Sequence, residues 1–438
     1  MDYVSTRAQT SSRPSAPVGL DQALTAGLAD DGGLYVPMQI PTLMPDRLDG
    51  SQPLAELASH VLQPFFSGSS LAPELDSICR QALDLPIPLV PVFADDHAWL
   101  LELFHGPTAA FKDFAARFLA TCLAALRNDP QQHQTVLVAT SGDTGAAVAS
   151  AFHRRPGFSV VILYPDGKVS PRQAHQLGAF GDNVHCYKVQ GNFDQCQAMA
   201  KQALNDVELS SRLGLTSANS ISMGRLLPQI TYYAYAALRL ANPNDKLNVI
   251  VPTGNLGNAL GCILARAMGL PIGRIVLATN ANRTLPDFFE HRNYRGRPGL
   301  ETLANAMDVG DPSNFERLAW FYRDADLHKA NLKAESINDD TIRQCIERVY
   351  RAGGYVLCPH TACAMELLHR YRKQGDSRTW LVAATAHPAK FETIVEAVTG
   401  QRLDPPPALA ELLTQSSHAV ALEPDVNQLR NELITIRQ

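Results

Sequence analysis

The chain has 438 residues, which predicts about two or three domains around a large buried core. Apolar residues make up 45% of it and charged residues 18%, a balance that excludes a disordered chain. The 38 lysines and arginines stand against 43 aspartates and glutamates, giving a net charge of −5. No basic field is left to hold nucleic acid or an anionic membrane.

The eight cysteines are spread through apolar stretches and form no C-x-x-C pair. The N-terminus lacks the apolar segment of a signal peptide, and no apolar run approaches the ~18 residues that a membrane span needs. We therefore expect free thiols in a reducing compartment, the cytoplasm. We expect a monomer or homodimer that acts on a small molecule, with no nucleic-acid, membrane or metal partner.

Residues 1–91 are predicted to form an N-terminal, mainly helical domain. The segment Thr10 to Pro17 is rich in Ser and Pro and is expected to be a loop. Further along we expect a helix from Leu20, a short strand near Tyr35 and helices between residues 51 and 85. Three prolines then mark the boundary of this domain: Pro86, Pro88 and Pro91.

Strand and helix patterns alternate after this boundary. Most of the strands are apolar on both faces, which is typical of a mostly parallel sheet covered by helices on both sides. We assign residues 92–230 to a smaller α/β domain and residues 231–438 to a larger one. The expected strands cover residues 98–104, 135–140, 159–164, 246–251, 274–279 and 380–384, and the expected helices cover residues 111–127, 145–153 and 259–268.

Several common motifs of α/β enzymes are absent. The chain contains neither G-x-G-x-x-G nor the phosphate loop G-x-x-x-x-G-K-[ST]. It also lacks H-E-x-x-H and G-x-S-x-G. These absences weigh against a nicotinamide dehydrogenase, a P-loop kinase, a zinc protease and an α/β-hydrolase.

Parallel sheets bind ligands beyond the carboxyl ends of their strands, so the loops there are the candidate ligand sites. The segment 253–258, TGNLGN, follows a strand and opens a helix, so its main-chain N–H groups and the helix N-terminus suit a phosphate monoester. An ordinary strand-to-helix turn explains this segment equally well. The segment 141–145, SGDTG, follows another strand, and by itself is better explained as a helix cap. Two loops of this kind at the same end of one sheet together favour a ligand-binding site over ordinary turns and helix caps.

Lys112 is the third element of this prediction, and it is the only lysine before Lys168. It lies between aromatic and small residues at a helix start, where desolvation and the helix dipole both lower the pKa of an amine. A neutral amine there can form an imine with a carbonyl cofactor. The ordinary alternative is a lysine that extends to water. A phosphate cradle, an amine and hydroxyl-rich loops together fit pyridoxal phosphate.

The motifs FHGPTAAFKDF, VATSGDTGAAVASAF, TSANSISMGR, VPTGNLGN and TAHPAKF, preceded by YVSTR, run in order from Tyr3 to Phe391. In this order they resemble the threonine synthase family, of the bacterial type with an extended N-terminal region. The resemblance implies a fold-type II enzyme with two open, twisted, mostly parallel sheets flanked by helices. It also implies conversion of O-phospho-L-homoserine and water to L-threonine and phosphate, the last step of threonine biosynthesis. Two small departures, Ala8 and Ala115, do not affect this expectation.

The resemblance assigns roles to residues of both loops. Lys112 would hold pyridoxal 5′-phosphate and act as the catalytic base, and Arg225 would bind the substrate phosphate. Asp143 would lie near the pyridine 3′-oxygen, although two anionic oxygens meet only with a shared proton, and Thr385 would contact the pyridine nitrogen. The cofactor phosphate would be bound by Gly254, Asn255, Leu256, Gly257 and Asn258, and the substrate by Ser141, Thr144, Asn219, Ser220 and Arg225.

Two alternatives remain at this point. A serine or threonine dehydratase of the same fold type would share Lys112 and the glycine loop but would need no second phosphate site. A non-catalytic protein would keep the fold and hold only the cofactor or a phosphorylated amino acid. Arg225→Ala separates the first alternative, and phosphate release from phosphohomoserine separates the second.

Overall fold

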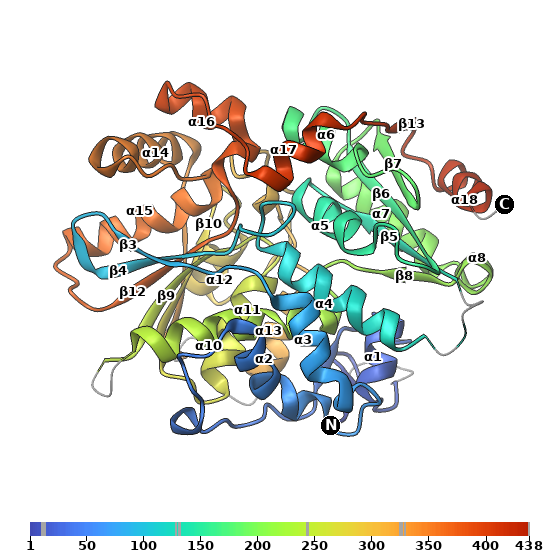
Figure 1. The fold of residues 1–438 in the computed structure, drawn as a ribbon, viewed down its shortest axis with the longest axis horizontal. Helices are drawn as coiled ribbons and strands as arrows, with labels where there is room; N and C mark the ends of the chain where they lie inside the picture. The colour runs from blue at the N-terminus through green and yellow to red at the C-terminus, as the bar shows by residue number, and fades with distance from the viewer. Residues whose placement is uncertain are drawn as a thin grey trace.

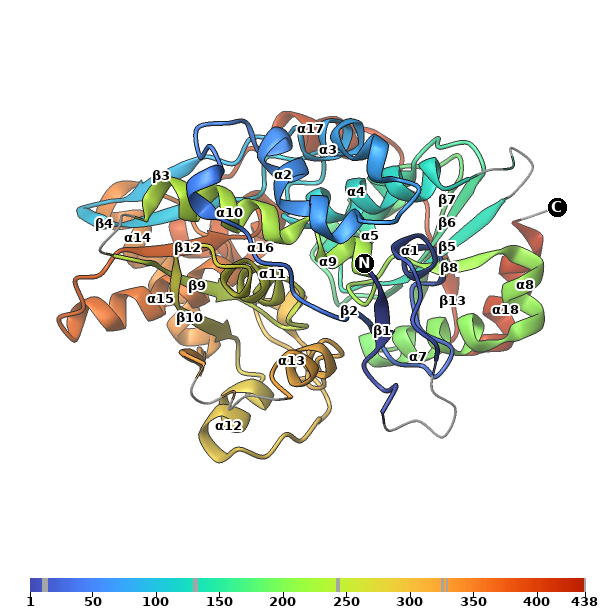
Figure 2. The ribbon, with the colours of Figure 1, turned by 90° about the horizontal axis from the view of Figure 1, so that it is seen from below.

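The computed structural model describes residues 1–9, 15–127, 129, 133–241, 245–323, 327 and 330–436. Part of the expected loop from Thr10 to Pro17, residues 10–14, lies outside the described residues. Two sheets stand side by side with helices around them, and the N-terminal region lies beneath both (Figure 1). The view from below in Figure 2 shows the N-terminal strands near the junction of the two sheets.

The N-terminal region is mainly helical, as the sequence predicted. Its strands β1 (Tyr3–Ser5) and β2 (Tyr35–Pro37) pair antiparallel. In its third helix the buried residues Leu75, Ile78, Cys79 and Ala82 recur with helical spacing and form the face that packs on the core. The helices of this region are α1 (Leu20–Ala26), α2 (Leu54–Leu62) and α3 (Leu75–Leu83), with short 3₁₀ turns at Pro45–Arg47, Gln63–Phe66 and Ala72–Glu74.

The larger sheet has six strands in the order β11-β10-β9-β12-β4-β3. All neighbours in it run parallel except β3 and β4, which are antiparallel. Its strands are β3 (Leu89–Val92), β4 (Asp95–Glu102), β9 (Leu247–Pro252), β10 (Ile272–Thr279), β11 (Leu332–Ser336) and β12 (Trp380–Ala384).

The smaller sheet has five parallel strands in the order β13-β7-β6-β5-β8. Every residue of its two central strands, β5 and β6, is buried, because helices cover both faces. Its strands are β5 (Gln134–Ala139), β6 (Phe158–Pro165), β7 (Val184–Val189), β8 (Leu215–Ser217) and β13 (Val420–Leu422).

The remaining helices surround the two sheets (Figure 1). They are α4 (Lys112–Ala125), α5 (Asp143–Phe152), α6 (Pro171–Gly178), α7 (Phe193–Asn205), α8 (Val207–Leu213), α9 (Met223–Leu226), α10 (Gln229–Leu240), α11 (Gly257–Ala267), α12 (Thr284–His291), α13 (Phe315–Phe321), α14 (Asp339–Gly353), α15 (Pro359–Lys373), α16 (Glu392–Thr399), α17 (Pro407–Thr414) and α18 (Val426–Thr435), with 3₁₀ turns η4 (Asn305–Met307) and η6 (Pro388–Phe391). No helix of the described ranges is both long and apolar enough to span a bilayer.

Alternate residues of each strand pack into different cores, because successive side chains point to opposite faces of a sheet. In β9, Val249 and Val251 pack with α11, whereas Ile250 packs in the cluster that contains α15. In β5, Val136 packs with α4 and α5, whereas Leu137 packs in the cluster of α7 and α18. The doubly covered, mostly parallel sheets predicted from sequence are thus confirmed.

The two sheets do not follow the domain boundaries expected at residues 91/92 and 230/231. Strand β4 lies in the expected smaller domain but pairs with β12 in the six-stranded sheet. Strand β13 lies in the expected larger domain but pairs with β7 in the five-stranded sheet. The chain therefore starts the larger sheet with β3 and β4, forms β5 to β8 of the smaller sheet, returns to the larger sheet for β9 to β12 and ends in the smaller sheet with β13. Such pairing between distant segments leaves no local signal in the sequence.

Candidate active site

One cavity of about 940 Å³, part of it open to solvent, lies where the carboxyl ends of strands from the two sheets face each other. Its wall contains residues that follow β5, β9 and β12, so the loops lie beyond the carboxyl ends of strands, as the rule for parallel sheets predicts. The expectation of a single sheet edge is wrong, because β5 belongs to the smaller sheet and β9 to the larger one. All the predicted site residues line this one cavity: Lys112, Ser141, Asp143, Thr144, Asn219, Ser220, Arg225, Gly254, Asn255, Leu256, Gly257, Asn258 and Thr385.

Lys112 is the first residue of α4, as the sequence predicted. The chain just before it is fastened to the end of β12, because the Phe111 N–H donates to the Thr385 carbonyl at 2.8 Å and the His387 N–H donates to the Ala109 carbonyl at 3.0 Å. Ala109 itself adopts the left-handed conformation, with φ of 56°. Such strain in a residue with a side chain is typical of functional sites. These contacts bring Lys112 and Thr385 to the same wall.

The amine of Lys112 is exposed to the cavity yet surrounded by protein. No described residue accepts a hydrogen bond from it, and its Nζ lies 5.9 Å from the centre of the Phe111 ring. Burial lowers the pKa of Lys112 to about 8, Asp143 opposes this shift, and the positive charges of Arg225 and Lys390 add to it. A lysine with this pKa is partly neutral near pH 7 and serves as a nucleophile or a base.

The loop from Gly254 to Asn258 forms a cup at the start of α11. Leu256 is buried in the left-handed conformation, with φ of 63°. Alternation of right- and left-handed residues turns successive N–H groups toward one point. Among the described residues, no protein group accepts a hydrogen bond from the five main-chain N–H groups of this loop. Free donors at a helix N-terminus fit a phosphate group.

Gly254 is required at its position by close packing. A Cβ atom there would lie 2.7 Å from the Cα of Met307 and 3.0 Å from its carbonyl oxygen. At the other end of the loop, the Asn258 Oδ1 atom accepts from the hydroxyls of Tyr232 and Tyr233 at 2.9 and 2.6 Å. The Asn258 Nδ2 atom is buried and has no protein partner. The loop is thus held rigidly from outside, while its donors are left for a ligand.

Three of the predicted substrate residues lie at or just before α9: Asn219 and Ser220 precede this helix, and Arg225 is part of it. Arg225 is buried, and its Nη1 atom donates to the Ala218 carbonyl at 2.5 Å, while its Nε atom has no protein partner. The Asn255 Nδ2 atom donates to the Ser220 hydroxyl at 2.6 Å. The Oδ1 atom of Asn219 is also buried without a partner. Unsatisfied buried polar atoms are costly, so these groups fit a polar ligand in the cavity.

The same segment is anchored by a second buried guanidinium that sequence reasoning missed. Arg317 on α13 donates to the carbonyls of Tyr35 and Ile221 at 3.0 and 2.6 Å and to the Asn314 side chain at 2.9 Å. It therefore joins the N-terminal region to the loop that carries Ser220. No local pattern marks Arg317 among the many arginines, because its partners come from three separate parts of the chain.

The SGDTG loop differs from the expected helix cap. The N-cap residue is Gly142, and the acceptor is the hydroxyl of Thr140, which accepts from the N–H groups of Gly142 and Gly145 at 2.9 Å each, a contact that sequence reasoning missed. Asp143 is the first residue of α5, and its Oδ1 atom lies 2.8 Å from the Nζ atom of Lys390. Both side chains are buried, and the positive charges of Lys390 and Lys112 hold the pKa of Asp143 well below its usual range.

Two further residues near the cavity carry no role from the sequence. Lys390 lies in the motif TAHPAKF, where a lysine between apolar residues after a buried strand was an available signal. His360 lines the cavity, and its Nε2 atom accepts from the Ala306 N–H at 3.1 Å. Burial lowers the pKa of His360 to about 4, so its ring is neutral at pH 7.

Comparisons with known proteins agree with this site. The family described as "Pyridoxal-phosphate dependent enzyme" matches residues 85–386. The families described as "Threonine synthase N terminus" and "Threonine synthase, C-terminal" match residues 2–83 and 361–432. A threonine synthase of Haemophilus influenzae is 39% identical over 422 residues, covering 96% of this chain and 98% of the relative.

Solved structures agree as well. The crystal structure of threonine synthase from Escherichia coli matches with a TM-score of 0.91 at 37% identity, covering 100% of both chains. The PLP-bound threonine synthase from Brucella melitensis matches with a TM-score of 0.89 at 33% identity, covering 100% of this chain and 99% of that one. Both likenesses extend over the whole chain, so they include the N-terminal region as well as the two sheets.

Two mostly parallel sheets, with a free lysine amine and a loop of free main-chain N–H groups in one cavity, are typical of the fold-type II enzymes that depend on pyridoxal 5′-phosphate, the class that the family match shows. The matches to threonine synthase families and to a threonine synthase relative extend along nearly the whole chain, and they narrow the assignment from this class to one family. The chain belongs to the threonine synthase family. It is a lyase whose cofactor is pyridoxal 5′-phosphate.

Proposed function

We propose that this chain converts O-phospho-L-homoserine and water to L-threonine and phosphate, the last step of threonine biosynthesis. One observation carries the proposal: the free amine of Lys112, the 254–258 cup and the buried Arg225 line a single cavity. A site for a phosphorylated amino acid needs room for two phosphates, one of the cofactor and one of the substrate. The cup and Arg225 are separate donors that meet this need.

The cofactor, when bound, supplies an aldehyde that reacts with amines and a ring that delocalises negative charge. Lys112 removes the α-proton of the substrate and then a proton from the neighbouring β-carbon, since one amine at the cavity wall reaches both carbons. Arg225 binds the γ-phosphate and holds it as it leaves. After the phosphate leaves, the γ-carbon gains a proton and becomes the methyl group of threonine, water adds its hydroxyl at the β-carbon, and the α-carbon regains a proton. The products therefore contain every atom of the substrate and of one water molecule.

The other predicted residues orient the two ligands. The N–H groups of residues 254–258 would bind the cofactor phosphate, and the Thr385 hydroxyl would contact the pyridine nitrogen. A neutral hydroxyl there leaves that nitrogen largely unprotonated and restrains side reactions. Asp143 would lie beside the 3′-oxygen of the ring. Ser141, Thr144, Asn219 and Ser220 would contact the substrate.

We further propose that the protein works in the cytoplasm. All eight cysteines are buried and free, which is typical of a reducing compartment.

The test is Lys112→Ala, measured by the visible absorbance of bound cofactor and by phosphate release from phosphohomoserine. Both should be lost. After borohydride treatment, the unaltered protein should carry the reduced cofactor on the peptide that contains Lys112. The matched change Lys168→Ala, in a surface lysine paired with Glu301, should leave both signals intact. Phosphate release by Lys112→Ala at the unaltered rate would overturn the proposal.

A further inference from the structure

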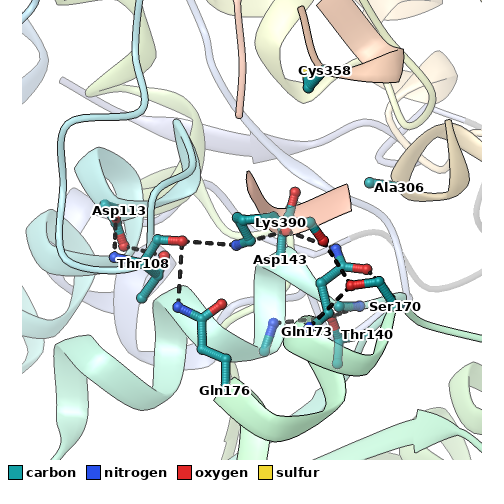
Figure 3. Close-up of polar contacts among 12 residues, drawn as sticks. Thr108, Asp113, Thr140, Asp143, Ser170, Gln173, Gln176, Ala306, Cys358 and Lys390 are labelled. Atoms are coloured by element: carbon teal, nitrogen blue, oxygen red, sulfur yellow. Dashed lines mark hydrogen bonds and ion pairs between the residues drawn. The ribbon is translucent and has the colours of Figure 1, made fainter. Parts of the chain in front are cut away.

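Lys390 is a second buried lysine beside the cavity. Its side chain is 1% exposed, and its Nζ atom donates to the Thr108 carbonyl at 2.7 Å. The same atom lies 2.8 Å from the Oδ1 atom of Asp143 (Figure 3). The main-chain carbonyl of Lys390 also accepts from the Ser170 hydroxyl at 2.6 Å. Lys390 is therefore fixed at both ends of its side chain.

Asp143 is held by two donors on one oxygen. Besides Lys390, the Nε2 atom of Gln173 donates to its Oδ1 atom at 3.0 Å (Figure 3). No described residue donates to the second oxygen, Oδ2, while the residue lines the cavity. Gln173 is fixed in turn, because its Oε1 atom accepts from the Ser170 N–H at 3.2 Å and from Asn305 at 3.2 Å. The carboxylate thus faces the site with one oxygen bound and one available.

The free Lys112 amine competes with a ligand for the buried Asp143 carboxylate. Asp143 and Lys112 influence each other's charge across the same cavity. If the Asp143 charge were not balanced, it would stabilise the ammonium form of Lys112, which is neither nucleophile nor base. Lys390, whose Nζ atom is paired with the Asp143 carboxylate, offsets part of that attraction.

We propose that Lys390 is a positioning residue whose ammonium neutralises Asp143, so that the carboxylate orients a ligand oxygen without pairing with the Lys112 amine. This also resolves how an anionic oxygen of the ligand can approach Asp143, because the Asp143–Lys390 pair is neutral as a unit. The proposal rests on Lys112 being the reactive amine of the proposed function. It adds the residue that keeps this amine reactive.

Two other charged groups near Lys112 do not pair with Asp143. Asp113 is turned away, since its carboxylate accepts from the Thr108 N–H and hydroxyl at 2.9 and 2.6 Å. Arg225 has the same sign as Lys390 but donates to a main-chain carbonyl and not to Asp143. The charged or titratable groups that act on Lys112 are Asp143 on α5, Arg225 on α9, His360 on α15 and Lys390 on η6.

The test measures the pKa of Lys112 in the full chain freed of cofactor, without turnover. Trace acetic anhydride is applied across a pH series, and the acetylated peptide containing Lys112 is quantified by mass spectrometry. Lys390→Met should raise the apparent pKa of Lys112 by about one unit or more, because Asp143 is then unbalanced. Asp143→Asn should lower it by about one unit or more, because the positive charges of Arg225 and Lys390 then act on Lys112 without an opposing carboxylate.

The double variant Asp143→Asn/Lys390→Met distinguishes charge balance from a merely structural role of Lys390. It removes both charges, and the pKa of Lys112 should lie between the values of the two single variants, because the two opposite effects then offset each other. A merely structural role for Lys390 would shift the pKa in one direction in all three variants, and this result would overturn the proposal. So would an unchanged pKa in Lys390→Met. The surface change Lys168→Met serves as the matched control, with no shift expected.

If Lys390→Met does not fold, the double variant is compared with Asp143→Asn. Loss of the Lys390 charge should then raise the pKa of Lys112, and no change would overturn the proposal. Failure of this coupling is distinct from failure of the proposed function, because borohydride trapping on Lys112 and phosphate release are measured separately.

Discussion

The phosphate cup makes a sharp prediction, because two glycines of one loop differ in what a methyl group would meet. In Gly254→Ala the new Cβ atom would lie 2.7 Å from the Cα of Met307, a main-chain atom that cannot rotate away. Carbon atoms in contact prefer about 3.5 to 4.0 Å, so the loop and the η4 segment must separate by roughly 0.8 Å. Overpacking of this kind costs about 1–3 kcal/mol.

That displacement moves the N–H groups that are free to bind phosphate. If about 1.4 to 2.8 kcal/mol of the cost appears in binding, the Kd for pyridoxal phosphate rises about 10- to 100-fold. The assay is a titration of the cofactor-free protein with pyridoxal phosphate, followed by its visible absorbance. The urea midpoint of the cofactor-free protein should fall as well, because the clash is with protein and not with the ligand.

Gly257→Ala is the matched control in the same loop. Its Cβ atom would meet nothing closer than Gln229 Nε2 and Ser220 Cβ, both at 3.6 Å, which is ordinary contact. Because Gly257 begins α11, alanine there should leave the urea midpoint of the cofactor-free protein unchanged or higher. Equal midpoints and equal cofactor affinities for the two variants would refute the steric reasoning.

Three further substitutions test other parts of the site. Arg225→Met should raise the KM for phosphohomoserine by about 10- to 100-fold, since a charge-assisted contact is lost; an unaltered KM in steady-state kinetics would contradict its assignment. Arg317→Met should lower the free energy of unfolding by about 2 to 4 kcal/mol in urea titrations, because it leaves buried carbonyls unpaired, whereas Arg343→Met at a surface ion pair should cost less than about 1 kcal/mol. The pKa of His360 falls from 6.5 to about 4 on folding, so the unfolded chain binds the extra proton between these values and stability should drop by roughly 1–3 kcal/mol as the pH is lowered through this window. His360→Gln keeps an acceptor for the Ala306 N–H and should flatten that drop; an equal drop in both proteins would assign it to other groups.

Much of the candidate site was predictable because its parts are local. A strand that is apolar on both faces, followed by glycine and a helix, places a loop at the carboxyl edge of a parallel sheet whatever the strand order is. For this reason the loops after β5 and β9 and the residue after β12 were found without knowing which strands pair. Lys112 was marked by its rarity and its apolar neighbours. Its lowered pKa follows from those neighbours and from the burial they cause.

The sequence alone thus determined the doubly covered sheets, the helix that starts at Lys112 and the loops that line the cavity. Only the tertiary structure decided which strands share a sheet, and hence that β4 and β13 cross the expected domain boundaries. It also decided the partners of Lys390, since Asp143 and Thr108 both lie far from it in the sequence, Thr108 by 282 residues. Local patterns reflect burial and turn geometry, which neighbouring residues fix. The pairing of buried charges depends on which distant segments the sheets bring together, and no residue carries that information by itself.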